Sequence, residues 1–275
     1  MSPNKVKNKT ILITGSTDGI GRQTALDLAQ TGATILLHGR NSARGERVLH
    51  AIKKATGNNR IELFIADLAS LNQVRILAEQ VHQKHESLDV LINNAGVYET
   101  TRKISQDGFE RTFAVNHLAP FLLTHLLLDL LKKGAPSRII NVSSMAHASS
   151  IDFENLQGEK HYGGYKAYAL SKLCNILFTY KLARRLEGTG VAANCLHPGV
   201  ITTKLLKAGW GVGGNPVTEG SKNSVYLATA SELDNVTGKY FMNRKQTKSS
   251  GVSYNQEIQK KLWHISEQLT GIVFK

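Results

Sequence analysis

The stretch TILITGSTDGIGRQTA, residues 10–25, decides the fold of this 275-residue chain. It opens with a short apolar run, continues with Gly15, Gly19 and Gly21, and ends in residues with helical periodicity. Glycines between a strand and a helix let the chain turn sharply, so that backbone N–H groups and the helix N-terminus can approach a pyrophosphate. The spacing G-x-x-x-G-x-G differs from the commonest dinucleotide fingerprint, and the alternative is an ordinary turn at a helix start. We interpret it as a dinucleotide-binding loop.

Short apolar runs alternate with longer amphipathic stretches along the rest of the chain. The expected strands cover residues 10–14, 34–38, 61–66, 89–93, 138–143 and 191–196, with a weaker one at 239–241. The expected helices lie around residues 20–30, 44–56, 71–84, 109–133, 168–186 and 218–230. Strands that are apolar on both faces and alternate with helices predict right-handed βαβ units. We therefore expect one α/β domain over residues 1–275, a Rossmann-type doubly wound parallel sheet of about seven strands with helices on both faces.

Two segments interrupt this rhythm. Residues 144–164 contain no clear strand, and the glycine-rich residues 207–216 are expected to be structureless. Long irregular loops inside a compact domain are usually functional or disordered.

Composition indicates the cellular compartment of the protein and argues against a membrane span, a disulfide framework and a metal site. The first ten residues, MSPNKVKNKT, lack the apolar run of a secretory signal. The most apolar stretch, residues 117–131, is interrupted by proline, histidine and aspartate and falls short of the roughly 18 apolar residues of a membrane span. Two lone cysteines, Cys174 and Cys195, predict neither a disulfide framework nor a metal site. We expect a cytoplasmic protein with no transmembrane segment and no bound metal.

The formal net charge of +13 first suggests an anionic partner. The basic residues are scattered, however, and no nucleic-acid-binding motif accompanies them. We expect a solvated basic surface and no nucleic-acid partner, with peripheral contact to anionic lipid as a minor alternative. A homo-oligomer is left open.

The end of the second expected strand, LLHGRN, indicates which nicotinamide cofactor is used. Enzymes that use the unphosphorylated dinucleotide place a carboxylate here to bind the ribose 2′-OH. Residues 38–41 contain none, and the guanidinium of Arg40 suits a 2′-phosphate. The prediction is NADP(H), and the alternative is a solvent-facing arginine.

Further motifs, in chain order, resemble those of the short-chain dehydrogenase/reductase family. They are TGSTDGIG, ADL, NNAG, FAVNHL, INVSS, YALSK and HPGV. Within the family, FERTFAVNHLAPFLLTHLLLDLL, SRIINVSSMAH, LARRLEGTGV and HPGVITTKL are most similar to the retinol dehydrogenase-like branch. Animal members of that branch often carry an N-terminal membrane segment, which these first residues do not show. Membrane residence and a retinoid substrate are therefore left open.

The resemblance implies a cofactor half to about residue 140 and a catalytic and substrate half over about 141–275. It also implies a set of cofactor contacts, which Arg40 joins on the argument above. The set is Gly15, Ser16, Thr17, Gly19, Ile20, Gly21, Arg40, Asp67, Leu68, Asn94, Ala95, Gly96, Tyr168, Lys172, Pro198, Gly199, Val200 and Thr203. The implied catalytic residues are Asn116, Ser144, Tyr168 and Lys172.

The family's Tyr-x-x-x-Lys spacing occurs twice in HYGGYKAYALSK, residues 161–172. A lysine four residues after a tyrosine lies on the same face of a helix. Tyr168 opens an amphipathic run, whereas Tyr162 is followed by two glycines, which disfavour a helix interior. We therefore expect Tyr162 and Lys166 to lie in a loop, and Tyr168 with Lys172 to be the working pair.

The chemistry requires a proton donor beside the carbonyl oxygen, because hydride transfer places negative charge there. The ammonium of Lys172 is expected to lower the pKa of Tyr168. The resemblance further implies that Lys172 binds the nicotinamide ribose, that Ser144 bonds the substrate oxygen, and that Asn116 helps to hold a relay water. Ser143 is the alternative serine, on the opposite face of the strand.

We accordingly expect an NADP(H)-dependent enzyme that interconverts apolar aldehydes or ketones and their alcohols. The segment 204–216 supplies Leu205, Leu206, Trp210 and Val212 as an apolar lid, or else as a loop packed back on the core. The alternatives are a steroid, sugar or polyketide-type ketoreductase, and a catalytically silent cofactor-binding regulator on the same fold.

Overall fold

One sheet of eight strands organises the computed structural model, which describes residues 6–274. Residues 1–5, part of the stretch on which the expectation of no secretory signal rests, lie outside the described part. The spatial strand order is β3-β2-β1-β4-β5-β6-β7-β8, and only the last pair is antiparallel. The strands are β1 Thr10–Ile13, β2 Thr34–Gly39, β3 Ile61–Ile65, β4 Val90–Asn93, β5 Ser137–Val142, β6 Val191–His197, β7 Tyr240–Met242 and β8 Lys245–Thr247.

The strand order reverses between β1 and β4. From β1 the chain proceeds outward through β2 to β3, returns to place β4 on the other side of β1, and then continues to β8. The loops after β1 and β4 therefore separate at the carboxyl edge of the sheet, which is where ligands bind in doubly wound folds.

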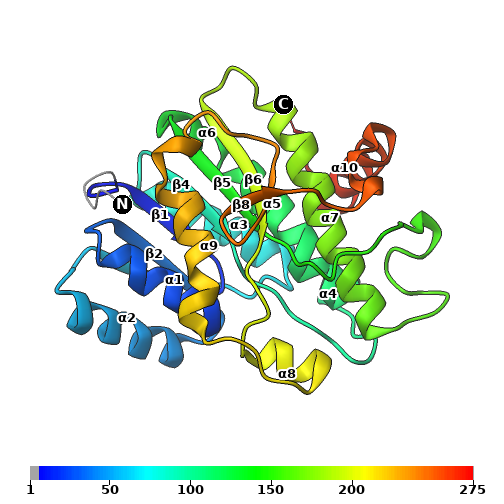
Figure 1. Cartoon of the computed structure of the whole chain (residues 1–275), viewed down its shortest axis with the longest axis horizontal. Coiled ribbons are helices and arrows are strands. Elements are labelled where there is room, and N and C mark those ends of the chain that lie inside the picture. The colour runs from blue at the N-terminus through cyan, green and yellow to red at the C-terminus, as the bar shows by residue number, and fades with distance from the viewer. Residues whose placement is uncertain (1–5, 275) are drawn as a thin grey trace.

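Helices cover both faces of the sheet (Figure 1). They are α1 Gly19–Ala29, α2 Ser42–Thr56, α3 Leu71–Lys84, α4 Arg111–Phe113, α5 Ala119–Leu126, α6 Leu128–Lys133, α7 Gly164–Arg185, α8 Lys204–Trp210, α9 Val217–Thr229 and α10 Gln256–Thr270. Figure 1 shows α1 and α9 side by side in front of the sheet.

Alternation along the strands fills two separate cores. On β1, Leu12 joins the core beneath α3, α5 and α7, whereas Ile11 and Ile13 join the core beneath α1, α2 and α9. All three side chains are fully buried. Burial on both faces explains why these strands are continuously apolar rather than alternating. The expected doubly wound architecture is confirmed.

The eighth strand is a difference from the sequence expectation of about seven. β7 and β8 form a hairpin whose turn residues, Asn243 and Arg244, have φ of 51° and 61°. Two-residue hairpin turns with positive φ at both positions usually show Asn-Gly or Asp-Gly, so arginine at the second position concealed this one. β8 itself, Lys-Gln-Thr, carries no apolar pattern.

The single helix expected over residues 109–133 is wrong. The segment is divided into α4, a π-helical turn η1 (Ala114–Leu118), α5 and α6. Hydrophobic periodicity alone does not reveal such a bulge. Helix α10 was not expected, although Asn255 caps its start and Gly271, with φ of 64°, ends it. It packs against α7.

The two irregular segments turned out differently. Residues 144–163 contain one short helical element, the 3-10 turn η2 (Phe153–Asn155), and Gly164 begins α7. The expectation of a structureless segment at 207–216 is wrong in its first part, because α8 extends to Trp210. Helix α7 begins at Gly164, so the expectation of a loop is wrong for Lys166, which lies in the first turn of the helix. Tyr162 lies in the loop before it, as predicted.

Candidate active site

A cavity of about 550 Å³ opens at the carboxyl edge of the sheet, beside the point where the strand order reverses. Its wall contains most of the residues expected to bind cofactor or substrate. They are Gly15, Thr17, Gly19, Ile20, Gly21, Arg40, Asp67, Leu68, Asn94, Ala95, Gly96, Ser144, Tyr168, Lys172, Pro198, Gly199, Val200 and Thr203. Segments that follow six different strands, β1 to β6, thus meet in one place together with the start of α7.

The glycine loop is shaped by close backbone contacts. Gly15 has φ of 64°, and a Cβ there would lie 2.8 Å from the Cα of Ala95. A Cβ on Gly21 would lie 2.4 Å from the carbonyl oxygen of Gly15. The side-chain amide of Asn94 donates to the carbonyl of Thr14 at 2.8 Å and so ties the β4 loop to the β1 loop. The N-terminus of α1 therefore lines the cavity with the glycine backbone of residues 19 and 21.

Ser16 is the one expected cofactor residue of this loop that lies beneath it. Its hydroxyl donates to the carbonyl of Ile13 at 2.8 Å and accepts from the amide of His38 at 2.9 Å. Its hydroxyl therefore supports the loop from below.

His38 lies near the end of β2 and is the first of residues 38–41, among which there is no carboxylate for NAD. Its Nε2 lies 3.1 Å from the carbonyl of Ala66, and its Nδ1 accepts from the amide of Gly15 at 3.1 Å. These two contacts fit a neutral ring protonated at Nε2. Burial lowers the pKa of His38 to about 4.

Two arginines lie at the same end of the cavity. Arg40 and Arg44 both line it, and Arg44 lies 3.8 Å from a carboxylate oxygen of Asp18. Arg44 was not singled out from the sequence. Its place in the first turn of α2 could have indicated it, because Asn41 caps that helix and accepts from the amide of Arg44 at 2.8 Å.

The serine and tyrosine form the opposite wall. Ser144 lines the cavity, whereas the hydroxyl of Ser143 is turned away and donates to the carbonyl of Lys172 at 2.7 Å. The side chains of Ser144 and Tyr168 are hydrogen-bonded to each other. The ammonium of Lys172 is buried, donates to the carbonyl of Val142 at 3.0 Å, and lies 5.5 Å from the centre of the Tyr168 ring.

The expectation that Lys172 lowers the pKa of Tyr168 does not hold in this structure. Burial raises the pKa of Tyr168 to about 12, and the hydrogen bond with Ser144 opposes that rise only in part. Burial also lowers the pKa of Lys172 to about 8. The ammonium lies over the ring, 5.5 Å from its centre, and the loss of solvent around the hydroxyl decides the direction of the shift in the pKa of Tyr168.

Asn116 is fully buried in η1, behind the cavity wall. Its side-chain oxygen accepts from the amide of Val97 at 2.8 Å, and its nitrogen donates to the carbonyl of Val97 at 3.0 Å and to Ser171 at 3.0 Å. The side chain thus pairs with the backbone of the segment after β4 as a neighbouring strand would. π-helical turns are frequent at functional sites.

The other tyrosine of the repeated motif serves a different place. The hydroxyl of Tyr162 donates to the carbonyl of Glu99 at 2.9 Å. Tyr162 and Lys166 both line a second cavity of about 490 Å³, apart from the one that contains Ser144. Of the two tyrosine–lysine pairs, only Tyr168 with Lys172 shares a cavity with the glycine loop.

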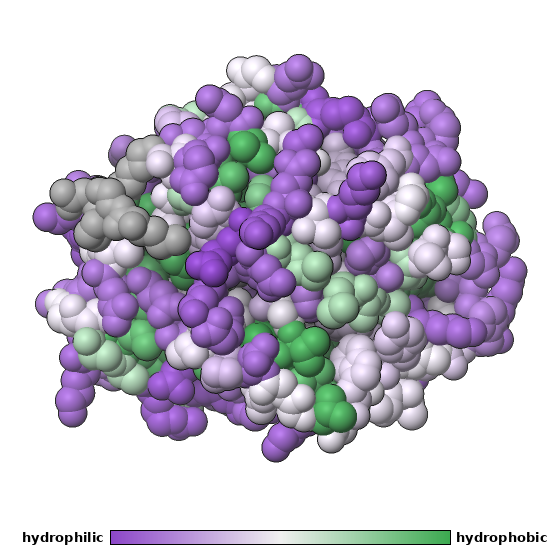
Figure 2. All heavy atoms as spheres, in the orientation of Figure 1, coloured by the Kyte–Doolittle hydropathy of each residue, from purple (hydrophilic) through white to green (hydrophobic). Residues whose placement is uncertain are grey.

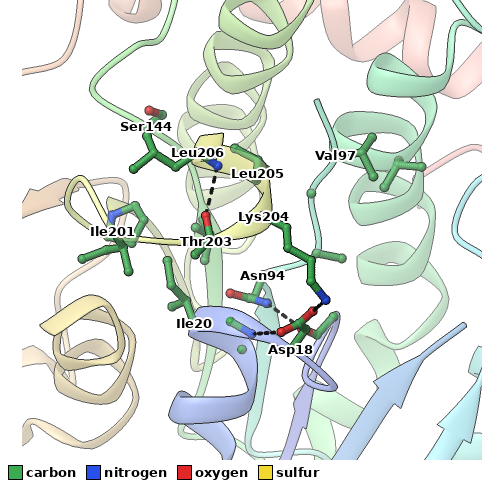
Figure 3. A pocket seen from close by; sticks show the side chains of 18 of the residues that line it. Asp18, Ile20, Asn94, Val97, Ser144, Ile201, Thr203, Lys204, Leu205 and Leu206 are labelled. Carbon is green, nitrogen blue, oxygen red and sulfur yellow. Dashed lines mark hydrogen bonds and ion pairs between the residues drawn. The ribbon is translucent and has the colours of Figure 1, made fainter. Parts of the chain in front are cut away.

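Helix α8 covers the mouth of the main cavity. Thr203 caps it, with its hydroxyl accepting from the amide of Leu206 at 3.1 Å (Figure 3). The ring centre of Trp210 lies 5.6 Å from that of Tyr168. Tyr98, which the sequence did not indicate, lies 5.5 Å from Trp210 and 5.8 Å from Tyr168. In Figure 2, apolar atoms interrupt the hydrophilic surface over α8, and Trp210 and Val212 are 37% and 51% exposed.

Comparison with known proteins agrees with this geometry. The model of the short chain dehydrogenase family matches residues 9–210. The human proteins named retinol dehydrogenase 13 and polyprenol dehydrogenase are 41% and 40% identical to this chain, each over 97% of the chain and 86% of the relative.

The chain belongs to the short-chain dehydrogenase family. It is a retinol dehydrogenase-like oxidoreductase.

Solved structures of this family share the fold. An uncharacterised protein of Mycobacterium paratuberculosis superimposes with a TM-score of 0.84 at 32% identity, over 99% of this chain and 97% of that one. A short-chain dehydrogenase of Escherichia coli, solved in complex with NADPH, has a TM-score of 0.73 at 25% identity, over 88% of this chain and 98% of that one.

Three further features of this dehydrogenase concern membranes, metals and thiols. Across residues 6–274, the helices are all too short or too polar to cross a membrane. In the same described range, no three or more His, Cys, Asp or Glu side chains gather as a metal site would require. Cys174 and Cys195 are buried free thiols.

Proposed function

We propose that this protein is an NADP(H)-dependent oxidoreductase that transfers a hydride between nicotinamide and an apolar aldehyde, ketone or alcohol. The observation that carries the proposal is the shared cavity. Ser144, Tyr168 and Lys172 form one wall of it, and the glycine loop with Arg40 forms another. A cofactor bound to the loop and a carbonyl bound to Tyr168 would therefore meet.

The residues present suit the phosphorylated cofactor. The N-terminus of α1 and the close-packed glycines favour a pyrophosphate, and Arg40 and Arg44 favour a 2′-phosphate. Residues 38–41 offer no carboxylate to the ribose 2′-OH of NAD, and the ring of His38 is fixed by its own hydrogen bonds. The NADPH bound by the Escherichia coli relative supports the same choice.

When bound, NADPH supplies the hydride. The protein's own contribution is to hold the proton and orient the carbonyl. With a pKa of about 12, Tyr168 keeps its proton at neutral pH and can donate it to the developing alkoxide. Ser144 can donate to the same oxygen, Lys172 can bind the nicotinamide ribose, and Asn116 can help hold a relay water. These residue roles are proposed from the family resemblance.

The apolar lining at the mouth indicates the substrate class. Leu205, Leu206, Trp210 and Val212 face this end of the cavity. Such side chains offer burial worth about 25 cal/mol per Å² to an apolar ligand but no charge for an acid or phosphate. We expect long or bulky apolar carbonyl compounds, retinal among them, to be preferred over small polar ones. Cytoplasmic location and a single domain over residues 1–275 stay predictions from the sequence.

The test is a screen of aldehydes and ketones with the purified protein, following consumption of NADPH and, separately, of NADH. We expect turnover of long apolar aldehydes with NADPH. A protein that binds NADPH but reduces no carbonyl compound would favour the regulator alternative instead.

A further inference from the structure

An ion pair joins the lid helix to the cofactor loop. Lys204, the first residue of α8, places its ammonium 2.5 Å from a carboxylate oxygen of Asp18. Asp18 caps α1, with its other oxygen accepting from the amide of Gly19 at 2.9 Å. Figure 3 shows Lys204 reaching down from α8 to this carboxylate, and both residues line the main cavity. The contact thus lies between the lid and the N-terminus of α1.

Asp18 has an unexpected charge for this position. The N-terminus of α1 and the glycine loop favour an anion, yet a carboxylate stands there already. Partial burial alone would raise the pKa of Asp18, but the hydrogen bond from Lys204, the bond from Gly19 and the charges of Lys204 and Arg44 together lower it. The carboxylate is therefore ionised at neutral pH. It repels an incoming phosphate and competes with it for the neighbouring cations.

Lys204 has the freedom to change partners. Its side chain is 77% exposed, and a lysine stem rotates about several bonds. Its neighbours on α8 are close to the cofactor groove, since Thr203 approaches Gly19 and Leu205 approaches Gly96. An ammonium at this place can reach either the carboxylate or an anion bound beside it.

We propose that Lys204 is a cofactor-binding residue, which Asp18 holds at the phosphate end of the cavity and which pairs with the pyrophosphate when NADP(H) binds. The lid then closes on the cofactor through charge, as well as on the substrate through apolar contact. This inference rests on the proposed use of NADP(H).

Asp18 and Lys204 consequently act on cofactor affinity in opposite directions. Replacing Lys204 removes an attraction and weakens binding. Replacing Asp18 removes a repulsion and a competitor, and so strengthens binding. A purely structural ion pair gives a different result, because losing either partner would loosen α8 and neither loss would improve affinity.

The test is calorimetric titration of NADPH into the unmodified protein and the variants Lys204→Met and Asp18→Asn. Asparagine caps a helix about as well as aspartate, so Asp18→Asn removes charge while keeping the cap. For exposed charges we expect about fivefold weaker binding for Lys204→Met and about threefold tighter binding for Asp18→Asn. Both differences should shrink at about 0.5 M salt.

Lys207→Met is the matched control, because Lys207 is exposed on the same helix and lies outside the cavity lining. It should leave the NADPH affinity unchanged. If both test variants weaken binding, or neither changes it while the unmodified protein binds NADPH, this inference is overturned and the proposed function stands. If the unmodified protein binds no NADPH, both are overturned.

Discussion

Two tyrosines with the same sequence spacing to a lysine differ in what their hydroxyl groups meet. The hydroxyl of Tyr162 is engaged by the carbonyl of Glu99, and that of Tyr168 by the side chain of Ser144 in the main cavity. Burial raises the pKa of both to about 12, so acidity does not distinguish them. The two tyrosines differ instead in their position relative to the cofactor loop.

Replacing Tyr168 with Phe should abolish turnover, because the proton donor is lost. The ring and its packing are kept. Affinity for NADPH should be largely retained. Steady-state kinetics with NADPH and a long-chain aldehyde, together with a binding titration, give both quantities.

Tyr162→Phe is the matched control. It removes a hydroxyl that bonds a loop carbonyl, so kcat should stay close to that of the unmodified enzyme. If this variant were inactive and Tyr168→Phe active, the choice between the two motifs would be wrong.

Replacing Arg40 with Ala should weaken NADPH binding by one to two orders of magnitude, since a charge-assisted contact is worth about 1.5–3 kcal/mol. NADH carries no 2′-phosphate, so its dissociation constant should hardly change. Titration of both cofactors checks this, and equal affinities for them in the unmodified protein would contradict the preference.

Residue identity could be predicted from motifs, but residue environment could not. Ser144 and Tyr168 lie together as their motifs indicate. The inward turn of Ser16 and the backbone pairing of Asn116 depend on neighbours from distant segments. The pKa of Tyr168 likewise depends on burial that only the assembled fold provides.

Among the helices and strands, α8 is the clearest case in which the prediction from sequence differs from the structure. Its glycines suggested an irregular chain, yet Thr203 caps a regular helix that ends at Gly211 with φ of 67°. A cap before and a glycine after are ordinary helix boundaries. The regular βαβ elements, by contrast, were predictable because their strands are buried on both faces and their helices bury one stripe.

Trp210→Ala should raise KM for long apolar aldehydes more than for short polar ones. The indole packs beside Tyr168 at the cavity mouth, so only a substrate that extends there loses contact area. Specificity constants for a long and a short aldehyde, measured in both proteins, test this. Equal constants that the substitution leaves unchanged would count against an apolar lid.

At the scale of the whole molecule, folding buries histidines that are neutral. His38 is entirely enclosed, and burial lowers its pKa from 6.5 to about 4. Burial also lowers the pKa of His197 to about 4. Between pH 6.5 and 4 these histidines are therefore protonated in the unfolded chain but largely neutral in the folded chain. The free energy of unfolding falls as the pH falls.

We expect His38 alone to cost about 3 kcal/mol of stability between neutral pH and pH 4. The full stability is present above about pH 6.5 and is lost as the pH drops toward the folded-state pKa. Urea unfolding at pH 7 and at about pH 4.5 measures the loss. His38→Asn cannot titrate, so its stability should fall less over that interval. Equal losses in both proteins would show that His38 is not responsible.

The placement of the two tryptophans gives this protein a built-in optical reporter. Trp263 is buried in the core, with its indole N–H donating to Glu267 at 2.9 Å, whereas Trp210 stands half-exposed on α8 beside Tyr98. Exchanging Trp263 for Phe would leave one indole emitter, located on the lid itself. Its emission would respond to solvent at the mouth of the cavity, so stopped-flow fluorescence could time the opening and closing of α8 with no dye attached to the chain.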